Sequence, residues 1–341
     1  MTCSCFIVPK SVLDRFAADT SLPADSREAF AATASLETVW RTLRSAHTEA
    51  SQSRLAIAPI VTTLAAAPAT PVFDCNSSTS LPGTALPSTS TDATGKRAGG
   101  EAAAVAQFYK HCFGRNSVDN AGKTLMSSIH YGTKYNNAFW NGSQMAYGDG
   151  DGNIFIDFTL SNDVIGHELT HGVTQYTLGL GYTNQAGALN EAISDVFGTM
   201  FRQWQGGQAV TAADWLIGSG IMGPVAKAKG YTCLRDMAHP DAGHCLSAQP
   251  ADFGHYVPGG DPHVNSGIPN RAFYLMAMAI GGNSWEKTGK VWYAALTAGS
   301  SPKMSFKAFA KRTRAAAKQL FPADPAVLAG VNAGWKGVGV A

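Results

Sequence analysis

Two histidines and a glutamate lie close together in the stretch from residue 161 to residue 177. They form the motif His167-Glu168-Leu169-Thr170-His171, which has the pattern H-E-x-x-H. If this stretch is helical, the spacing of four residues puts both imidazoles on one face, where they can bind the same zinc ion while Glu168 lies beside them. The motif therefore predicts a catalytic zinc site. A helix that holds two histidines by chance is the alternative.

The residues around the motif favour a helix. Polar residues that can cap its start precede the motif: Ser161, Asn162 and Asp163. Apolar residues recur through it at near-helical spacing: Val164, Ile165, Leu169 and Val173. Gly166 and Gly172 lower the helix propensity, so we expect another segment to pack closely against this helix and hold it in place.

A third zinc ligand is available downstream, in the segment from Asn190 to Asp195. Acidic and apolar residues alternate there at helical spacing, and Glu191 completes a set of two histidines and one carboxylate. Such a set leaves the fourth position of zinc for water, which the metal acidifies and which Glu168 can deprotonate. Asp195, one turn after Glu191, would accept a hydrogen bond from the far nitrogen of a ligand histidine and orient it.

Four sequence blocks carry a resemblance to a known family. They are NNAFWNGSQMAYGDGDG at 136–152, the HELTH motif, GALNEAISDVFGT at 187–199 and HVNSGIPNRAFYL at 263–275. The chain resembles the thermolysin-type zinc endopeptidases, and among them the protealysin-like branch. This resemblance implies an α+β zincin with a β-rich N-terminal lobe, an α-helical C-terminal lobe and the motif helix in the cleft between them.

The resemblance also implies a precursor. Residues 1–50 are expected to be a short inhibitory propeptide, residues 51–166 the N-terminal lobe and residues 167–341 the C-terminal lobe. The segment from Phe6 to Pro9 would lie over the active site until the chain is cut between about Ala46 and Ala69. Family members usually carry a second proline where this chain has Lys10.

Two further groups match family residues that stabilise the negatively charged transition state. These are His263 and Tyr182. The family usually orients this histidine with an aspartate five residues earlier, where this chain has Pro258. Asp261, two residues before His263, is the expected substitute.

Substrate-binding positions carry over in the same way. Asn137 and Ala138 match the edge strand that binds the substrate backbone by strand addition. Arg235 matches an arginine that binds a substrate carbonyl, a task suited to a guanidinium. The pocket for the residue after the cleaved bond is expected to be apolar: Phe155, Phe158, Val164, Ile217 and Leu234. Such a pocket favours cleavage before bulky hydrophobic residues.

Calcium ligands are only partly retained. Asp163 and Asp214 match acidic ligands of the family's double calcium site, but Arg202, Leu216 and Ser219 stand where further carboxylates are expected. Because a hard cation needs several oxygen ligands, we expect at most one weak calcium site.

Composition limits the partners. The chain has 341 residues, 45% hydrophobic and 15% charged, with a net charge of +2. These values favour a compact globular protein without nucleic-acid or membrane partners. The resemblance implies protein or peptide substrates, and we expect a monomer. No secretory signal is recognisable, so secretion would be non-classical, with a cytoplasmic location as the alternative.

The six cysteines leave two readings open. Cys3 and Cys5 lie in the expected propeptide, which leaves Cys75, Cys112, Cys233 and Cys245. A Cys233–Cys245 disulfide is favoured over other pairs because the loop between them is short and polar, and buried free thiols are the alternative. For the whole chain, the alternative function is a catalytically weak or idle peptide-binding module, which the presence of Glu168 argues against.

The remaining elements follow from periodicity. Helices are expected in these ranges: 11–47, 102–113, 186–204, 268–280, 284–298, 305–320 and 325–333. Strand-like runs occur at 57–64, 71–73, 125–131 and 136–147.

Overall fold

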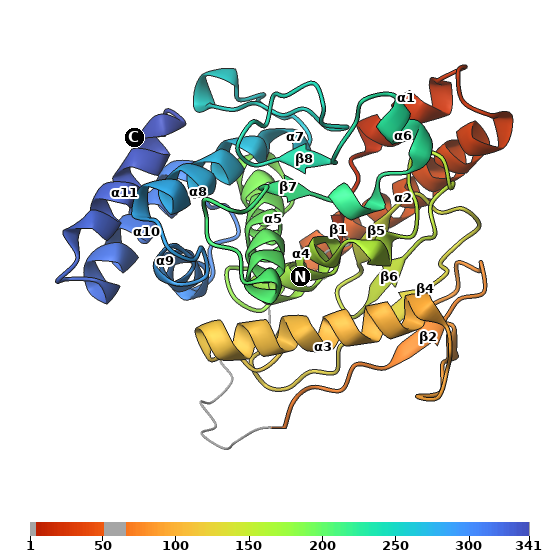
Figure 1. Ribbon diagram of the computed structural model, residues 1–341, viewed down its shortest axis with the longest axis horizontal. Coiled ribbons are helices and arrows are strands. Elements are labelled where there is room, and N and C mark those ends of the chain that lie inside the picture. Colours follow the sequence, from red (N-terminus) through yellow and green to blue (C-terminus); the bar gives the residue numbers. More distant parts are fainter. Residues whose placement is uncertain (1–4, 51–65, 341) are drawn as a thin grey trace. The chain divides into compact units, whose positions relative to one another are not determined.

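A computed structural model describes residues 5–50 and 66–340 of the chain. The chain divides into two compact units (Figure 1). The first unit runs to Gln175 and also includes Gly220–Gly230. The second comprises Tyr176–Ser219 and the residues from Tyr231 onward. The first unit combines a mixed sheet with helices and the second is mainly helical, so the predicted α+β class is confirmed.

The first unit is built on a six-stranded sheet with the order β1-β5-β6-β4-β2-β3. Its strands are β1 (Cys5–Phe6), β2 (Val72–Asp74), β3 (Thr84–Ala85), β4 (Ser127–Ile129), β5 (Ala138–Trp140) and β6 (Met145–Tyr147). β4 pairs in parallel with both β2 and β6, whereas the other pairs are antiparallel. The predicted runs at 125–131 and 136–147 contain β4, β5 and β6, and the run at 71–73 overlaps β2. β1 and β3 were not predicted, and the run at 57–64 lies outside the described residues.

The start of the chain belongs to this sheet. β1 pairs with β5 in the register Cys5 to Trp140 and Phe6 to Phe139. Two helices follow it, α1 (Lys10–Ala18) and α2 (Ala24–Ala50), as the apolar spacing predicted. The ring of Phe30 on α2 packs 5.3 Å from Phe16 and 6.0 Å from Phe155, between centroids. The N-terminal segment is therefore folded onto the rest of its unit and shares its core.

Helix α3 (Ala93–Phe113) begins nine residues before the predicted start at residue 102. The side chain of Asp92 accepts a hydrogen bond of 2.6 Å from the backbone N–H of Gly95, which caps the helix. The helix ends at Gly114, whose φ of 68° lets it close the last turn in the left-handed conformation. The glycines at the start of this helix hid its first turns from the periodicity.

Helix α4 (Asn162–Gln175) carries the H-E-x-x-H motif and lies in the interior of the first unit. Every residue from Asp163 to Thr174 is buried. A Cβ on Gly172 would come within 3.0 Å of Val118 and 3.2 Å of Trp140. The close packing predicted from Gly172 is thus confirmed, and tertiary contacts hold the helix where propensity is low.

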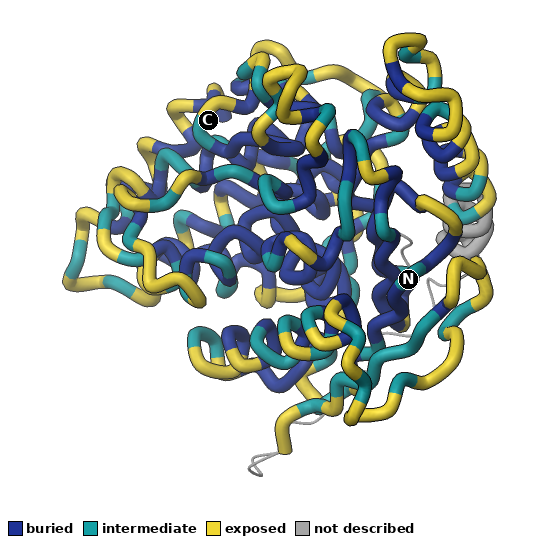
Figure 2. The backbone as a smooth tube through the Cα atoms, turned by 45° about the vertical axis from the view of Figure 1, so that its right-hand side comes forward, coloured by how far each residue is buried: buried dark blue, intermediate teal, exposed yellow. Residues whose placement is uncertain are grey.

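The second unit contains a helical core (Figure 2). Its helices are α5 (Asn184–Gly206), α7 (Pro262–Asn265), α8 (Gly267–Ile280), α9 (Lys287–Thr297), α10 (Phe306–Leu320) and α11 (Pro325–Gly337). The indoles of Trp292 and Trp335 stack in this core at 6.0 Å, and Phe309 packs edge-on against both. Two short strands, β7 (Leu216–Ile217) and β8 (Arg235–Asp236), pair with each other, and the sequence analysis missed both.

The favoured disulfide is not formed. Cys233 and Cys245 are free and buried, with 3.8 Å between their sulfur atoms, whereas a disulfide needs about 2.05 Å. Cys75 and Cys112 are not disulfide-bonded either. The disulfide prediction was therefore wrong, and the alternative of free thiols applies to these four residues. Loop length made the pairing sterically reasonable but could not specify the distance.

Among the described residues, no helix is long and apolar enough to cross a membrane.

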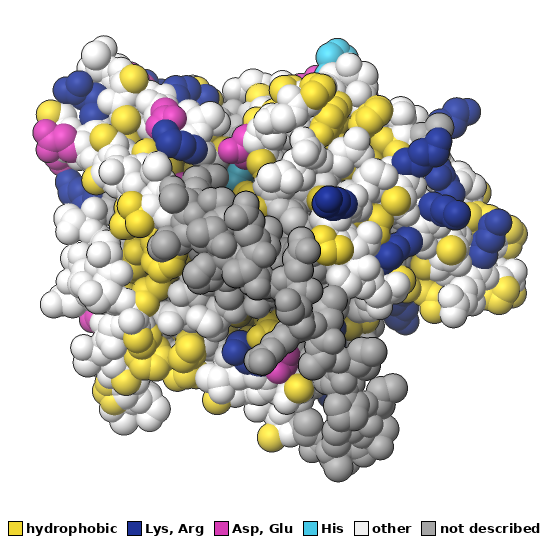
Figure 3. Space-filling view, turned by 180° about the vertical axis from the view of Figure 1, so that it is seen from behind, with side chains coloured by type: hydrophobic (Ala, Val, Ile, Leu, Met, Phe, Trp, Pro, Cys, Tyr) yellow, Lys and Arg dark blue, Asp and Glu magenta, His cyan; other side chains and the backbone are white. Residues whose placement is uncertain are grey.

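On the face shown in Figure 3, Lys and Arg side chains are most numerous on the right-hand part, with few acidic neighbours. Helix α10 alone carries five basic residues and no acidic one.

Candidate active site

Within the first unit, the two histidines of α4 face each other. The Nε2 atoms of His167 and His171 are 3.0 Å apart, and the two rings, both buried, meet at 85°. Two imidazoles bound to one tetrahedral zinc, with bonds of about 2.0–2.1 Å, would hold their ligand nitrogens about 3.3 Å apart. The donor type, the burial and the distance all fit a shared zinc ion.

Glu168 lies on the same buried stretch, fully shielded from solvent. Burial, with a further contribution from the carboxylate of Glu168, raises the pKa of the Tyr147 phenol. Thr170, inside the motif, fixes the helix, since its hydroxyl lies 2.7 Å from that of Tyr109 on α3. A fixed helix keeps the carboxylate and the two imidazoles in one arrangement, as a general base beside a metal requires.

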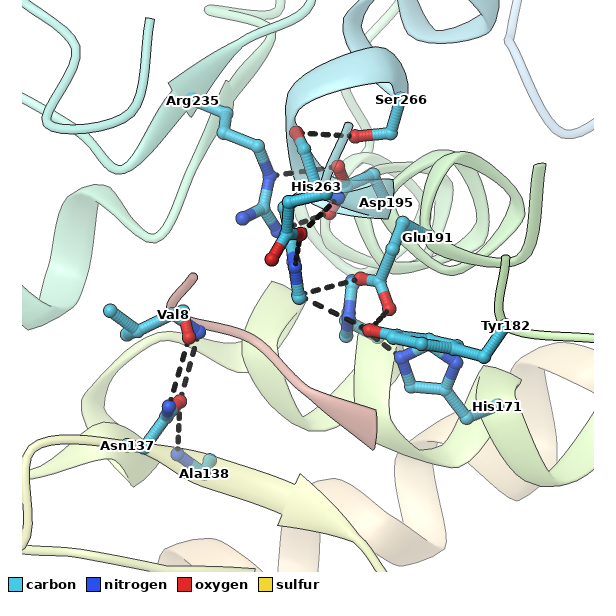
Figure 4. Close-up of polar contacts among 12 residues, drawn as sticks. Val8, Asn137, Ala138, His171, Tyr182, Glu191, Asp195, Arg235, His263 and Ser266 are labelled. Carbon is cyan, nitrogen blue, oxygen red and sulfur yellow. Dashed lines mark hydrogen bonds and ion pairs between the residues drawn. The ribbon is translucent and has the colours of Figure 1, made fainter. Parts of the chain in front are cut away.

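The edge-strand residues of the same unit bind the N-terminal segment. The side-chain oxygen of Asn137 accepts a hydrogen bond of 2.9 Å from the backbone N–H of Val8, and its amide donates one of 3.0 Å to the Val8 carbonyl (Figure 4). The backbone N–H of Ile7 donates to the Ala138 carbonyl at 3.2 Å. Asn137 also donates to Glu37 on α2. The positions predicted to hold a substrate backbone thus hold the chain's own start.

Within the second unit, α5 presents Glu191 and Asp195 one turn apart. The hydroxyl of Tyr182 donates to one carboxylate oxygen of Glu191, and the Nε2 atom of His263 lies 3.3 Å from the other. The hydroxyl of Tyr182 and the Nε2 atom of His263 are 3.4 Å apart (Figure 4). Sequence reasoning named all three residues, and the structure brings them together around one buried carboxylate.

Asp261 lies against His263. Its carboxylate is 2.7 Å from the Nδ1 atom of His263 and also accepts a hydrogen bond from the His263 backbone N–H. Burial lowers the pKa of His263, but the negative charges of Glu191 and Asp261 outweigh that effect and raise it. Asp261 therefore supplies a carboxylate to the histidine, as the sequence analysis expected. Sequence reasoning missed Gln249 and Ser266, which both donate to the His263 carbonyl.

Asp195 and Arg235 form a buried ion pair. Nε and Nη2 of Arg235 donate to the two carboxylate oxygens at 2.9 and 2.7 Å, and Asn270 adds a hydrogen bond of 2.8 Å. Both partners of the pair are fully buried. Burial opposes the charge of Arg235, but Asp195 outweighs it and the pKa of the guanidinium is raised. The sequence proposed separate tasks for these two residues and did not reveal the link or Asn270.

The five predicted pocket residues are all buried. In the first unit, the rings of Phe155 and Phe158 are 5.4 Å apart, and Val164 lies in the buried part of α4. In the second unit, Leu234 donates its backbone N–H to the carbonyl of Ile217 at 2.9 Å.

The expected calcium ligands have protein partners. Ser161 donates a hydrogen bond to Asp163 in the first unit. In the second unit, the guanidinium of Arg202 pairs with Asp214 and lies 3.4 Å from the hydroxyl of Ser219. A fixed positive charge thus stands beside Asp214.

Two family profiles match this chain. The profile of the thermolysin metallopeptidase catalytic domain matches residues 63–175, and that of the thermolysin metallopeptidase alpha-helical domain matches residues 178–340. The chain belongs to the thermolysin family. It is a zinc-dependent metalloendopeptidase, and the predicted family, enzyme class and two-lobed fold are confirmed.

Relatives agree with this assignment. An extracellular metalloprotease of Pectobacterium carotovorum subsp. carotovorum is 42% identical over 283 residues, which cover 79% of this chain and 80% of that protein. Protease PrtS of Photorhabdus sp. (strain Az29) is 39% identical, covering 79% and 76%. The solved precursor of protealysin, a metalloproteinase from Serratia proteamaculans, superposes with a TM-score of 0.84 at 37% identity, covering 99% of this chain and all of that one.

Proposed function

We propose that this thermolysin-family enzyme is made as a precursor whose first 50 residues block its own active site. The observation that carries the proposal is the pairing of β1 with β5, together with the two hydrogen bonds between Val8 and Asn137. A peptide substrate bound by strand addition needs the same backbone groups and the same amide. Substrate and N-terminal segment therefore compete for one edge.

We propose His167, His171 and Glu191 as the ligands of one zinc ion. When bound, zinc would polarise the scissile carbonyl and lower the pKa of the attacking water. Glu168 then takes the proton of that water and passes it to the leaving amine. Tyr182 and His263 donate hydrogen bonds to the oxyanion, and Asp261 keeps the Nε2 atom of His263 turned toward it.

The proposed specificity is cleavage on the N-terminal side of bulky hydrophobic residues. The apolar character of the five pocket residues supports it, since none offers a polar group to an incoming side chain. Asp195 holds Arg235 through two hydrogen bonds, which would orient the guanidinium for binding a substrate carbonyl. Asp195 would thus act through Arg235 as well as through a ligand histidine.

We also propose that the enzyme acts outside the cell as a monomer on protein or peptide substrates. The relative from Pectobacterium is named an extracellular metalloprotease, which supports secretion. The division into residues 1–50, 51–166 and 167–341 is part of the same proposal.

Removal of zinc tests the proposed function. We expect casein cleavage by the trimmed enzyme to stop when a zinc-selective chelator is added and to return when zinc is restored, because the remaining side chains cannot polarise the peptide carbonyl alone. Metal content should fall to zero and recover to one zinc per chain in parallel. A trimmed protein that holds one zinc and does not cleave casein would instead support the idle peptide-binding module.

Calcium should matter little for stability. Arg202 supplies a positive charge to Asp214 where calcium would otherwise sit, and the carboxylates that a calcium ion needs are missing. We therefore expect melting temperatures with excess calcium and with a calcium-selective chelator to agree within a few degrees. A rise on the order of 10 °C on adding calcium would demonstrate a tight site and contradict this expectation.

A further inference from the structure

The N-terminal segment places a sulfur atom beside a proposed zinc ligand. Cys5 on β1 is fully buried, and its sulfur lies within 4.8 Å of a ring nitrogen of His171. The position of Cys5 is fixed by its pairing with Trp140 on β5, and β1 also contacts α4. The same strand that binds the substrate edge therefore carries a cysteine to the imidazole pair.

The chemistry of cysteine suits this position. A thiolate binds zinc at about 2.3 Å, so sulfur and imidazole nitrogen on one tetrahedral zinc would be about 3.5 Å apart. The sulfur of Cys5 lies within 4.8 Å of that nitrogen, so the two atoms would have to approach each other by at most about 1.3 Å. Three protein ligands leave one zinc position, and a thiolate there would close it to water and to the scissile carbonyl.

The redox state of Cys5 decides whether it can bind. Cys5 is disulfide-bonded in the structure, and a disulfide sulfur carries no negative charge for zinc. The four other described cysteines are not disulfide-bonded. The propeptide can thus exist with a thiolate or with a disulfide next to the metal site.

We propose that reduced Cys5 is the fourth zinc ligand of the precursor. Oxidation of Cys5 to a disulfide then removes its sulfur from the fourth position of zinc, while the three other ligands keep the ion. This inference rests on the proposed zinc site and propeptide. In the reduced state, the Cys5 thiol loses its proton and the thiolate binds zinc. A disulfide oxidant reverses this step: the Cys5 thiolate leaves zinc and, together with its partner thiol, loses two electrons as one S–S bond forms. The oxidant takes up these electrons, the proton of the partner thiol and one proton from solvent, and becomes two thiols. The N-terminal segment then blocks only the substrate edge.

Inhibition of the precursor would therefore be removed in two steps. A reducing compartment would hold the precursor with both the edge strand and the zinc position closed. An oxidising environment outside the cell would open the zinc position before the chain is cut. Processing would then be favoured after export.

Cobalt substitution tests this directly. Full-length Glu168→Gln precursor, which cannot process itself, would be loaded with Co²⁺ and measured after treatment with a dithiol reductant or a disulfide oxidant. We expect an intense near-ultraviolet sulfur-to-cobalt charge-transfer band in the reduced form and its loss on oxidation. Cys5→Ser in the same background should lack the band in both forms, whereas the control Cys112→Ser should keep it.

A second measurement does not depend on a folded Cys5 variant. In the reduced precursor, zinc should slow alkylation of Cys5 by iodoacetamide at least about tenfold, because a metal-bound thiolate is less available as a nucleophile. Bound cobalt without the charge-transfer band, together with alkylation that zinc does not affect, would overturn the role of Cys5 and leave the zinc site intact. A precursor that binds no cobalt would overturn the zinc assignment as well.

Discussion

Glu168→Gln is expected to leave zinc bound and to lower peptide hydrolysis by about 10²–10⁴-fold, the usual contribution of a general acid–base group. The amide has the size of the carboxylate but cannot take the proton from the attacking water. Because Glu168 is fully buried on α4 and is not a proposed ligand, the substitution should disturb neither His167 nor His171. The assay is casein cleavage by trimmed enzyme, with zinc content measured on the same sample.

Two matched variants make the result specific. Glu286→Gln changes an exposed glutamate in the same way and should keep full activity. Glu191→Ala should instead lose zinc on dialysis, because two imidazoles alone bind the metal weakly. A fall of less than about tenfold for Glu168→Gln would remove its role as the base. A fully metallated Glu191→Ala protein would remove Glu191 from the ligands.

Much of the site could be predicted because its chemistry depends on short spacings within helices. The interval of four between His167 and His171 fixes their common face once the segment is helical, and the interval between Glu191 and Asp195 does the same for α5. The long helices of the second unit were found within a few residues because long amphipathic segments carry a strong period, whereas the four-residue helix α7 was not predicted.

What could not be predicted depends on contacts between segments that are distant in the sequence. The ion pair of Asp195 with Arg235 joins residues 40 positions apart, and Asn270 completes it from 75 positions away. Neither spacing leaves a local signal. The free Cys233 and Cys245 illustrate the same limit, since a favourable loop length does not bring two sulfur atoms to bonding distance.

The link between Asp261 and His263 is an intermediate case. The family position for the orienting carboxylate is occupied by Pro258, and the sequence offered Asp261 as a substitute. Asp261 caps α7 by accepting a hydrogen bond from the His263 backbone N–H, and its carboxylate also makes the short hydrogen bond to the His263 ring. Both contacts are local, because they join residues two positions apart.

The second large effect concerns the first fifty residues. Precursor is expected to be about 10³-fold less active than trimmed enzyme. A tethered segment acts at an effective concentration of about 1 mM, so a segment with a dissociation constant of about 1 μM would leave about one active site in a thousand open. The contacts of Val8 with Asn137 and of Phe30 with Phe155 provide that affinity. Pro9, buried directly after Val8, has no N–H to donate and resists binding as an ordinary substrate.

A variant of the segment separates blocking from folding. Phe30→Ala removes the ring that packs on Phe155 while leaving the hydrogen bonds at Asn137, and it should raise the activity of the uncut precursor. The exposed Glu28→Gln on the same helix is the control and should remain inactive until cut. A Phe30→Ala precursor as silent as wild type would show that the contact between Phe30 and Phe155 does not contribute to inhibition.

The central claim is that the chain's own start occupies the active site of a zinc endopeptidase, and joint measurement of N-terminal sequence and casein cleavage tests it most directly. Wild-type protein would be followed during processing, alone and mixed with full-length Glu168→Gln precursor. We predict that the activity of wild-type protein rises in step with cleavage between about Ala46 and Ala69. If the mutant is cut only when wild type is added, processing occurs between molecules. Equal activity of intact and trimmed wild-type protein would contradict the claim.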